Sequence, residues 1–139
     1  MNIQEGNLNN FFCFGARRCS RKITNFFDNY LKKLGVKSTQ IHLLLAISLG
    51  GKSLTKISEN LGMDRTTLTR GVVPLERDRL IRKVYSSNRR DRVYALTDHG
   101  EDIKNRGLIL LQEAERIIAS KLGSERYERI SGDLLGFEI

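Results

Sequence analysis

Five residues between positions 65 and 70 carry side chains that suit the recognition of nucleic acid. They are Arg65, Thr66, Thr67, Thr69 and Arg70. A hydroxyl group can bond to a phosphate or to a base edge, and the methyl group of a threonine can pack against that of thymine. An arginine can donate two hydrogen bonds to one guanine, which discriminates against other bases by about 1–3 kcal/mol. The alternative is a solvated helix face, but no acidic residue follows Asp64 in this stretch.

The surrounding segment has the pattern of a helix-turn-helix. Two short helices are expected, and their apolar inner faces are Leu54, Ile57 and Leu61 in the first, and Leu68, Val72 and Leu75 in the second. Gly62 permits the sharp turn between them, and Met63 fills the gap. Ser53 and Asp64 are residues of the type that caps a helix N-terminus. This geometry turns the first half of the second helix outward, toward a DNA groove, and Ser53 and Thr55 are the expected contacts to the DNA backbone.

Two positions near the end of the second helix break local rules. Pro74 lies inside the helix, where it removes a backbone donor and crowds the carbonyl of Arg70. Gly71 can absorb part of the resulting kink. Arg79 stands at the helix exit, where glycine adopts the left-handed conformation more easily, and this substitution could cost up to about 1–2 kcal/mol.

After this helix the apolar period changes to that of a β-hairpin. The runs 80–85 and 92–96 are short and of β type, and they flank the loop Ser-Ser-Asn-Arg-Arg-Asp. Arginine at a protruding loop tip can enter a narrow minor groove, where the negative potential is enhanced. Arg89, Arg90 and Arg92 are therefore the expected DNA contacts of a wing, although alone the loop could equally be a solvated charged turn.

The whole chain is expected to form a single domain, 1–139, of mainly α class with a small β-hairpin wing. Long amphipathic helices are predicted over 11–34 and 98–122, and a short one over 124–135. Between them, 38–97 forms the winged helix-turn-helix lobe and begins with a helix at 39–49 that is apolar almost all round. Ser38 is the predicted cap of that helix, and Thr97 that of the helix from Asp98.

The charge distribution supports a localised surface for a polyanion. The net charge is +8. Residues 52–97 carry eleven basic and five acidic side chains, whereas residues 98–139 carry six basic and nine acidic ones. A basic middle and an acidic tail are typical of a nucleic-acid-binding face, although charge alone is also consistent with a solvated face without a partner.

Other classes of protein receive little support. No apolar run approaches the roughly 18 residues that span a membrane, and no signal peptide is evident, so the expected location is the cytoplasm. The sequence has no catalytic or dinucleotide motif, which predicts that the chain is not an enzyme and needs no cofactor. Cys13 and Cys19 have no metal-ligand spacing, and we expect two reduced thiols, at least one of them buried.

Four stretches of the chain resemble the MarR family of winged helix-turn-helix regulators. They are FGARRCSRKITNFFDNYLKKLGVKSTQIHLL, LTKISENLGMDRTTLTRGVVPLERDRLI, the NRR of the wing, and YALTDHG. The resemblance implies a homodimer formed by the helices of 11–34 and 98–139, which binds a pseudo-palindromic operator on double-stranded DNA. It also implies a repressor that a small aromatic or phenolic ligand releases. The family often has Asp-x-Arg in the wing, whereas this chain has Asn88, with Arg90 at the matching tip.

The resemblance also suggests two modes of regulation. Cys13 resembles the peroxide-sensing cysteine of one branch of the family, and Arg17 lies one turn away and could activate the thiol. That branch surrounds its cysteine with tyrosines, but Arg17 and Phe27 stand at two of those places. A carboxylate ligand would need a cation near the hinge, for which Arg17, Arg21 and His42 are candidates. His42, between two apolar residues, could instead be a core residue.

A competing hypothesis is a winged helix that serves as a protein-interaction module or binds nucleic acid without sequence preference. Such a module would bind DNA weakly and with strong salt dependence. The arginines and threonines of the second helix favour a specific reader instead.

Overall fold

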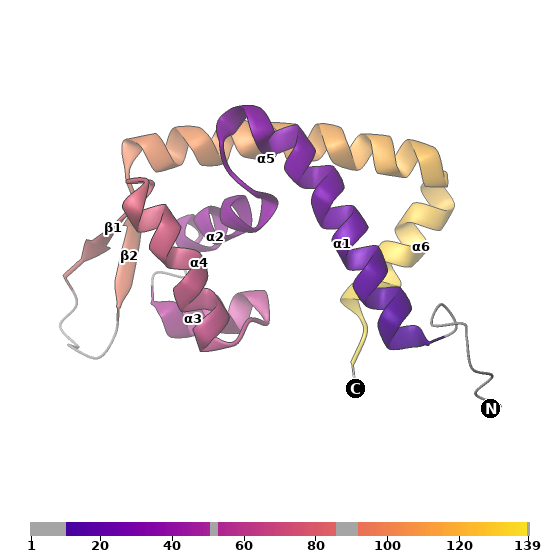
Figure 1. Cartoon of the computed structure of the whole chain (residues 1–139), viewed down its shortest axis with the longest axis horizontal. Helices are drawn as coiled ribbons and strands as arrows, with labels where there is room; N and C mark the ends of the chain where they lie inside the picture. Colours follow the sequence, from indigo (N-terminus) through magenta and orange to yellow (C-terminus); the bar gives the residue numbers. More distant parts are fainter. Residues whose placement is uncertain (1–10, 51–52, 86–91, 139) are drawn as a thin grey trace.

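Two structural parts lie side by side beneath one long helix (Figure 1). The computed structural model describes residues 11–50, 53–85 and 92–138. Helix α5 (Asp98–Leu122) runs along the top of the view, and helices α1 (Phe12–Leu31) and α6 (Ser124–Leu135) lie under one end. Under the other end lie α2 (Ser38–Ser48), α3 (Leu54–Leu61), α4 (Arg65–Arg77) and the hairpin of β1 (Ile81–Val84) and β2 (Val93–Leu96). The predicted fold class, mainly α with a β-hairpin, is confirmed.

Helix α2 forms the centre of the winged part, which consists of α2, α3, α4, β1 and β2. Ile41, Leu44 and Ile47 are almost fully buried, and α2 packs against α1, α3, α4 and α5. The predicted inner faces of the next two helices close over it, with Leu54, Ile57, Leu68, Val72 and Leu75 all buried and Leu61 partly buried. The strands β1 and β2 pair in antiparallel register from Ile81 opposite Leu96 to Val84 opposite Val93.

The start of α2 differs from the prediction. Ser38 is not the cap but the first residue of the helix, and Lys37 occupies the cap position. The backbone N–H and the hydroxyl of Ser38 both donate to one oxygen of Asp28, each at 2.7 Å. The carboxylate of Asp28 on α1 thus replaces the local cap, and it links α1 to the start of α2 by hydrogen bonds. The N–H of Lys37 donates to the side-chain oxygen of Gln40 at 2.9 Å.

The other predicted caps are confirmed. Ser53 accepts from the N–H of Lys56 at 3.3 Å, Asp64 from that of Thr67 at 2.9 Å, and Thr97 from that of Gly100 at 3.0 Å. Hydrogen bonds from the hydroxyl and the N–H of Thr67 lower the pKa of Asp64, which keeps a negative charge at the positive end of α4.

A tight junction joins α4, the hairpin and α5. Arg79 follows α4 in the left-handed conformation with φ of 57°, as predicted. The hydroxyl of Thr97 donates to the carbonyl of Arg79 at 2.7 Å, and the N–H of Thr97 donates to that of Leu80 at 3.0 Å. A Cβ at Gly100 would overlap the carbonyl oxygen of Leu80, so the glycine permits α5 to approach the backbone that closely. This junction explains Thr97 and Gly100 of the Thr-Asp-His-Gly motif.

The part formed by α1, α6 and the C-terminal end of α5 has much exposed apolar surface. Helix α6 has no buried residue, and α5 has none beyond Ala114. Phe12 is 76% exposed and Leu135 is 90% exposed. Cys13 and Cys19 are both exposed, so the prediction that at least one thiol is buried is wrong. The error arose because the stripe of α1 that carries them is not covered by the rest of the chain.

None of the helices in the described part of the chain is long and apolar enough to cross a membrane.

Candidate nucleic-acid interface

Helix α4 presents opposite faces to the core and to solvent. Leu68, Val72 and Leu75 are buried on one face. Arg65, Thr66 and Arg70 are exposed on the other, and Thr69 is half-buried, with its hydroxyl donating to the carbonyl of Arg65 at 2.8 Å. The capping by Asp64 and the sharp turn at Gly62, which is left-handed with φ of 59°, set the direction in which these side chains project.

Thr67 is placed apart from the other four predicted contacts. Its hydroxyl donates to Asp64, and its N–H donates to the same carboxylate. The side chain lines a cavity on another side of α4, where Met63 is a neighbour. The structure thus brings together Arg65, Thr66, Thr69 and Arg70, but commits Thr67 to the cap.

The four remaining residues line a groove of about 630 Å³ together with Leu54 and Arg92. Three arginines, two on α4 and one directly before β2, therefore surround one depression, and none of the described residues that line it is acidic. The groove has the size and charge to receive polar groups of a polyanion.

The start of α3 is hydrogen-bonded to the hairpin beside this groove. The N–H of Leu54 donates to the carbonyl of Arg92 at 3.2 Å, and Ser53 forms a β-bridge with Val93. Ser53 is half-buried and its hydroxyl acts as the cap of α3, whereas Thr55 lies exposed. The two predicted backbone contacts are thus the sequence neighbours of Leu54, which lines the groove, and Thr55 is the more exposed of the two.

Of the three predicted wing arginines, only Arg92 is among the described residues. It is exposed, directly before β2. Arg89 and Arg90 lie outside the described residues, as does Asn88.

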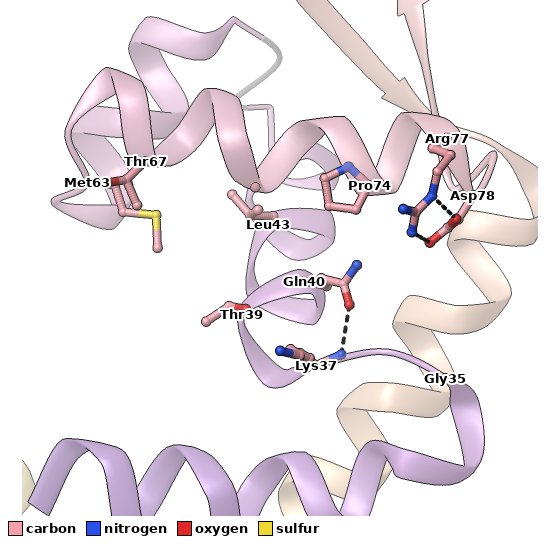
Figure 2. Close-up of a pocket in the computed structure, with 11 residues that line it drawn as sticks. Gly35, Lys37, Thr39, Gln40, Leu43, Met63, Thr67, Pro74, Arg77 and Asp78 are labelled. Carbon is pink, nitrogen blue, oxygen red and sulfur yellow. Dashed lines mark hydrogen bonds and ion pairs between the residues drawn. The ribbon is translucent and has the colours of Figure 1, made fainter. Parts of the chain in front are cut away.

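A cavity that the sequence did not indicate lies between α4 and the entry of α2 (Figure 2). Its volume is about 500 Å³. It is lined by Gly35, Lys37, Thr39, Gln40, Leu43, Met63, Thr67, Gly71, Pro74, Arg77 and Asp78. Arg77 and Asp78 form an ion pair at one end, 2.8 Å long, and hydrogen bonding from Arg77 lowers the pKa of Asp78. The one usable signal was the pair Gly71 and Pro74, which leave α4 without bulk on this side.

The predicted ligand and redox residues lie elsewhere. Arg17 and Arg21 are exposed on α1, and neither lines this cavity. His42 is exposed on α2 rather than in the core, although partial burial of its ring lowers its pKa, an effect that the charge of Glu115 opposes. Cys13 is exposed near the start of α1. The described residues contain no cluster of side chains that could hold a metal ion.

Comparison with known proteins shows the family of the chain. It is 30% identical over 107 residues to the HTH-type transcriptional regulator SarZ of Staphylococcus epidermidis, an alignment that covers 76% of this chain and 72% of SarZ. The chain belongs to the MarR family. No protein-family model matches it. The MarR-family regulator MosR of M. tuberculosis, solved in complex with DNA, has the same fold, with a TM-score of 0.82, 26% identity and coverage of 90% of this chain and 91% of MosR.

A second solved structure confirms the MarR fold. The transcriptional repressor CouR, bound to a 23-mer DNA duplex, superposes with a TM-score of 0.81 at 22% identity, covering 97% of each chain. Members of this family are transcriptional regulators that bind DNA. The MarR-family chain described here is accordingly a DNA-binding transcriptional regulator and not an enzyme.

Proposed function

We propose that the protein is a sequence-specific repressor that binds a pseudo-palindromic operator as a homodimer. The observation that carries the proposal is the groove at α4, where Arg65, Thr66 and Arg70 project from a capped helix toward Arg92 at the base of the hairpin. Helices of this kind read the edges of bases in the major groove, while flanking arginines bind phosphates or the minor groove.

Each element of the groove has a distinct task in the proposed complex. Arg65 and Arg70 donate to guanine, or to phosphate at the edge of the site. Thr66 and Thr69 contact base edges through a hydroxyl or a methyl group. Ser53 and Thr55 hold the backbone beside the start of α3. Arg92, with the Arg89 and Arg90 predicted for the wing, follows the adjacent minor groove.

Dimerisation would cover the exposed apolar surface on α1, on α5 beyond Ala114 and on α6. The exposed side chains include Phe12, Ile23, Ile117, Leu134, Leu135 and Phe137, and the rings of Phe12 and Phe137 stack 5.9 Å apart. Soluble monomers rarely expose so much contiguous apolar surface. A two-fold axis through this end would place one α4 on each half-site, so that the symmetry of the operator matches that of the protein.

The cavity beside α4 is the proposed site of the effector. The cavity lies between the α1–α2 connection and α4, the helix proposed to read DNA. A molecule that fills it therefore changes the position of α4 relative to the dimer helices. Leu43, Met63 and Pro74 suit an aromatic body, and Lys37 or Arg77 suits a carboxylate or phenolate. CouR has also been solved with p-coumaroyl-CoA, an aromatic thioester. This placement replaces the hinge cations Arg17, Arg21 and His42 of the sequence-based prediction.

Thiol-based peroxide sensing through Cys13 is the alternative mode of regulation. The exposure of Cys13 allows a peroxide to reach the thiol. The measurement is DNA release after treatment with cumene hydroperoxide, for wild type and Cys13→Ser. Peroxide sensing requires release by wild type only, and equal behaviour of the two proteins rejects it.

The proposed function is tested by selecting genomic fragments that the purified protein binds at about physiological salt, where non-specific binding is weak. An inverted repeat is the expected result. Arg70→Ala should then relax the preference at one position of each half-site, by about 1–3 kcal/mol per contact. Arg106→Ala is the matched control, because Arg106 is an exposed arginine on α5, paired with Asp102.

A second outcome would support the competing hypothesis. Selection without any motif, with Arg70→Ala and Arg106→Ala weakening all sequences alike, would indicate an electrostatic or protein-binding module and would reject the specific repressor.

A further inference from the structure

One apolar side chain stands on the solvent face of the DNA-reading helix. Val73 is 59% exposed and lies one turn beyond Thr69 and Arg70. Successive helix residues are about 100° apart, so Thr66, Arg70 and Val73 share a strip about 60° wide, opposite the buried side chains of α4. Val73 continues the line of the predicted DNA contacts past the end of the groove.

Folding of the chain does not explain a valine at this position. An exposed β-branched residue loses side-chain freedom in a helix without gaining buried contacts. The following residue is Pro74, and the residue before a proline is disfavoured in the helical conformation that Val73 adopts. Alanine would avoid the loss of side-chain freedom, whereas the restriction before a proline applies to alanine as well. An exposed residue that breaks a local propensity rule without a gain in packing points to a function of its side chain.

We propose that Val73 reads thymine, by packing its methyl groups against the thymine 5-methyl group in the major groove. This inference rests on the proposed sequence-specific function of α4. Thymine is the base that presents a methyl group in the major groove, so an apolar contact there distinguishes it from the other three. Three helix residues rise about 4.5 Å and a base pair about 3.4 Å, which places the thymine one or two base pairs from the base bound by Arg70.

The surroundings of Val73 favour DNA over a protein partner. Protein-docking patches are contiguous apolar areas. Val73 is instead a single apolar group next to Arg70 and Thr69, on the same helix as a groove lined by three arginines. A cationic surface that carries one exposed aliphatic side chain is complementary to a phosphate backbone that encloses a thymine methyl group.

The experiment removes single methyl groups from the operator. In the repeat recovered by selection, each thymine of both half-sites is replaced in turn by deoxyuridine, and Kd is measured at fixed salt for wild type and Val73→Ala. At one position, replacing the thymine of one half-site should weaken binding by wild type about fourfold, which corresponds to about 0.8 kcal/mol per methyl group. Replacing the thymine at that position in both half-sites should weaken binding about fifteenfold. Val73→Ala should bind the two operators equally, because the contact is already absent.

Three controls test whether the sensitivity to deoxyuridine belongs to the side chain of Val73. Ile109→Ala removes an apolar side chain of matched exposure, 57%, from α5 and should keep the full sensitivity to deoxyuridine. Thr66→Ser removes the other methyl group of the same strip. The melting temperature of Val73→Ala should equal or exceed that of wild type, which excludes misfolding as the cause of weaker binding.

The outcomes are distinct. If the selection with wild type yields no operator sequence, the proposed function fails, and with it the assignment of Val73 as a thymine reader. If wild type binds an operator specifically but tolerates deoxyuridine everywhere, or if the sensitivity persists in Val73→Ala and disappears in Thr66→Ser, the assignment to Val73 is overturned and the proposed function stands.

Discussion

Gly100→Ala should be among the most damaging small substitutions in the chain. The added Cβ would overlap the carbonyl oxygen of Leu80 and lie 2.9 Å from its carbonyl carbon. This obstacle is backbone, which Thr97 holds by hydrogen bonds, so no side chain can rotate away. Overpacking costs about 1–3 kcal/mol, and a rigid obstacle places the cost near the upper limit. Alanine recovers at most about 1 kcal/mol of helix propensity, so a net loss of about 2 kcal/mol is expected.

The assay is urea unfolding followed by circular dichroism at one fixed protein concentration, because the stability of a dimer depends on concentration. Gly132→Ala is the matched control, since a Cβ at this helical position of α6 would meet nothing within 4 Å. It should gain up to about 1 kcal/mol. If the two variants have the same stability, α5 does not need the close approach to Leu80, and the role of Gly100 in the junction is refuted.

Three further substitutions test the conformation and the contacts described above. Arg79→Gly should gain about 0.5–1 kcal/mol in the same unfolding assay, because it removes left-handed strain at the cost of chain entropy, and a loss would contradict the assigned strain. Asp28→Ala should lose about 2–3 kcal/mol, because the buried N–H and hydroxyl of Ser38 lose their charged acceptor, and a neutral result would deny that link. Burial lowers the pKa of His42 below 6.5, and the charge of Glu115 only partly opposes this effect. As the pH falls through 6.5, the unfolded chain therefore binds a proton at this residue before the folded chain does. Wild type should then lose more stability than His42→Gln over that pH range. Parallel pH curves for the two proteins would show that His42 contributes nothing to this loss.

Local signals in the sequence predicted most of the winged part. The caps Ser53, Asp64 and Thr97 act on backbone groups three residues away, so sequence order alone identifies them. The same is true of Arg79, whose strained conformation follows from its place after a helix. Ser38 was misassigned because its partner Asp28 is ten residues away on another helix, and the local pattern of a capping serine gives no sign of a distant carboxylate.

Features that depend on contacts between distant segments were out of reach. One wall of the cavity forms where Gly71 of α4 packs closely against Leu43 of α2, since an added Cβ would lie 2.8 Å from a leucine methyl group. Periodicity marked the apolar stripe of α1, but it cannot tell a stripe that packs in the same chain from one left for a partner. For that reason at least one of Cys13 and Cys19 was expected to be buried, and both proved exposed.

The two sides of α4 connect the proposed recognition of DNA with the proposed response to a ligand. Thr66 and Arg70 face the groove, whereas Thr67 and Gly71, each the next residue in the chain, face the cavity. A rigid helix of thirteen residues cannot move at one surface and stay fixed at the other. A ligand that moves α4 out of its DNA-binding position from the cavity side therefore weakens operator binding, and by thermodynamic linkage the operator weakens ligand binding by the same factor. Equal factors in the two titrations would establish that coupling, whereas a ligand whose affinity is indifferent to operator DNA would bind elsewhere or act on another step.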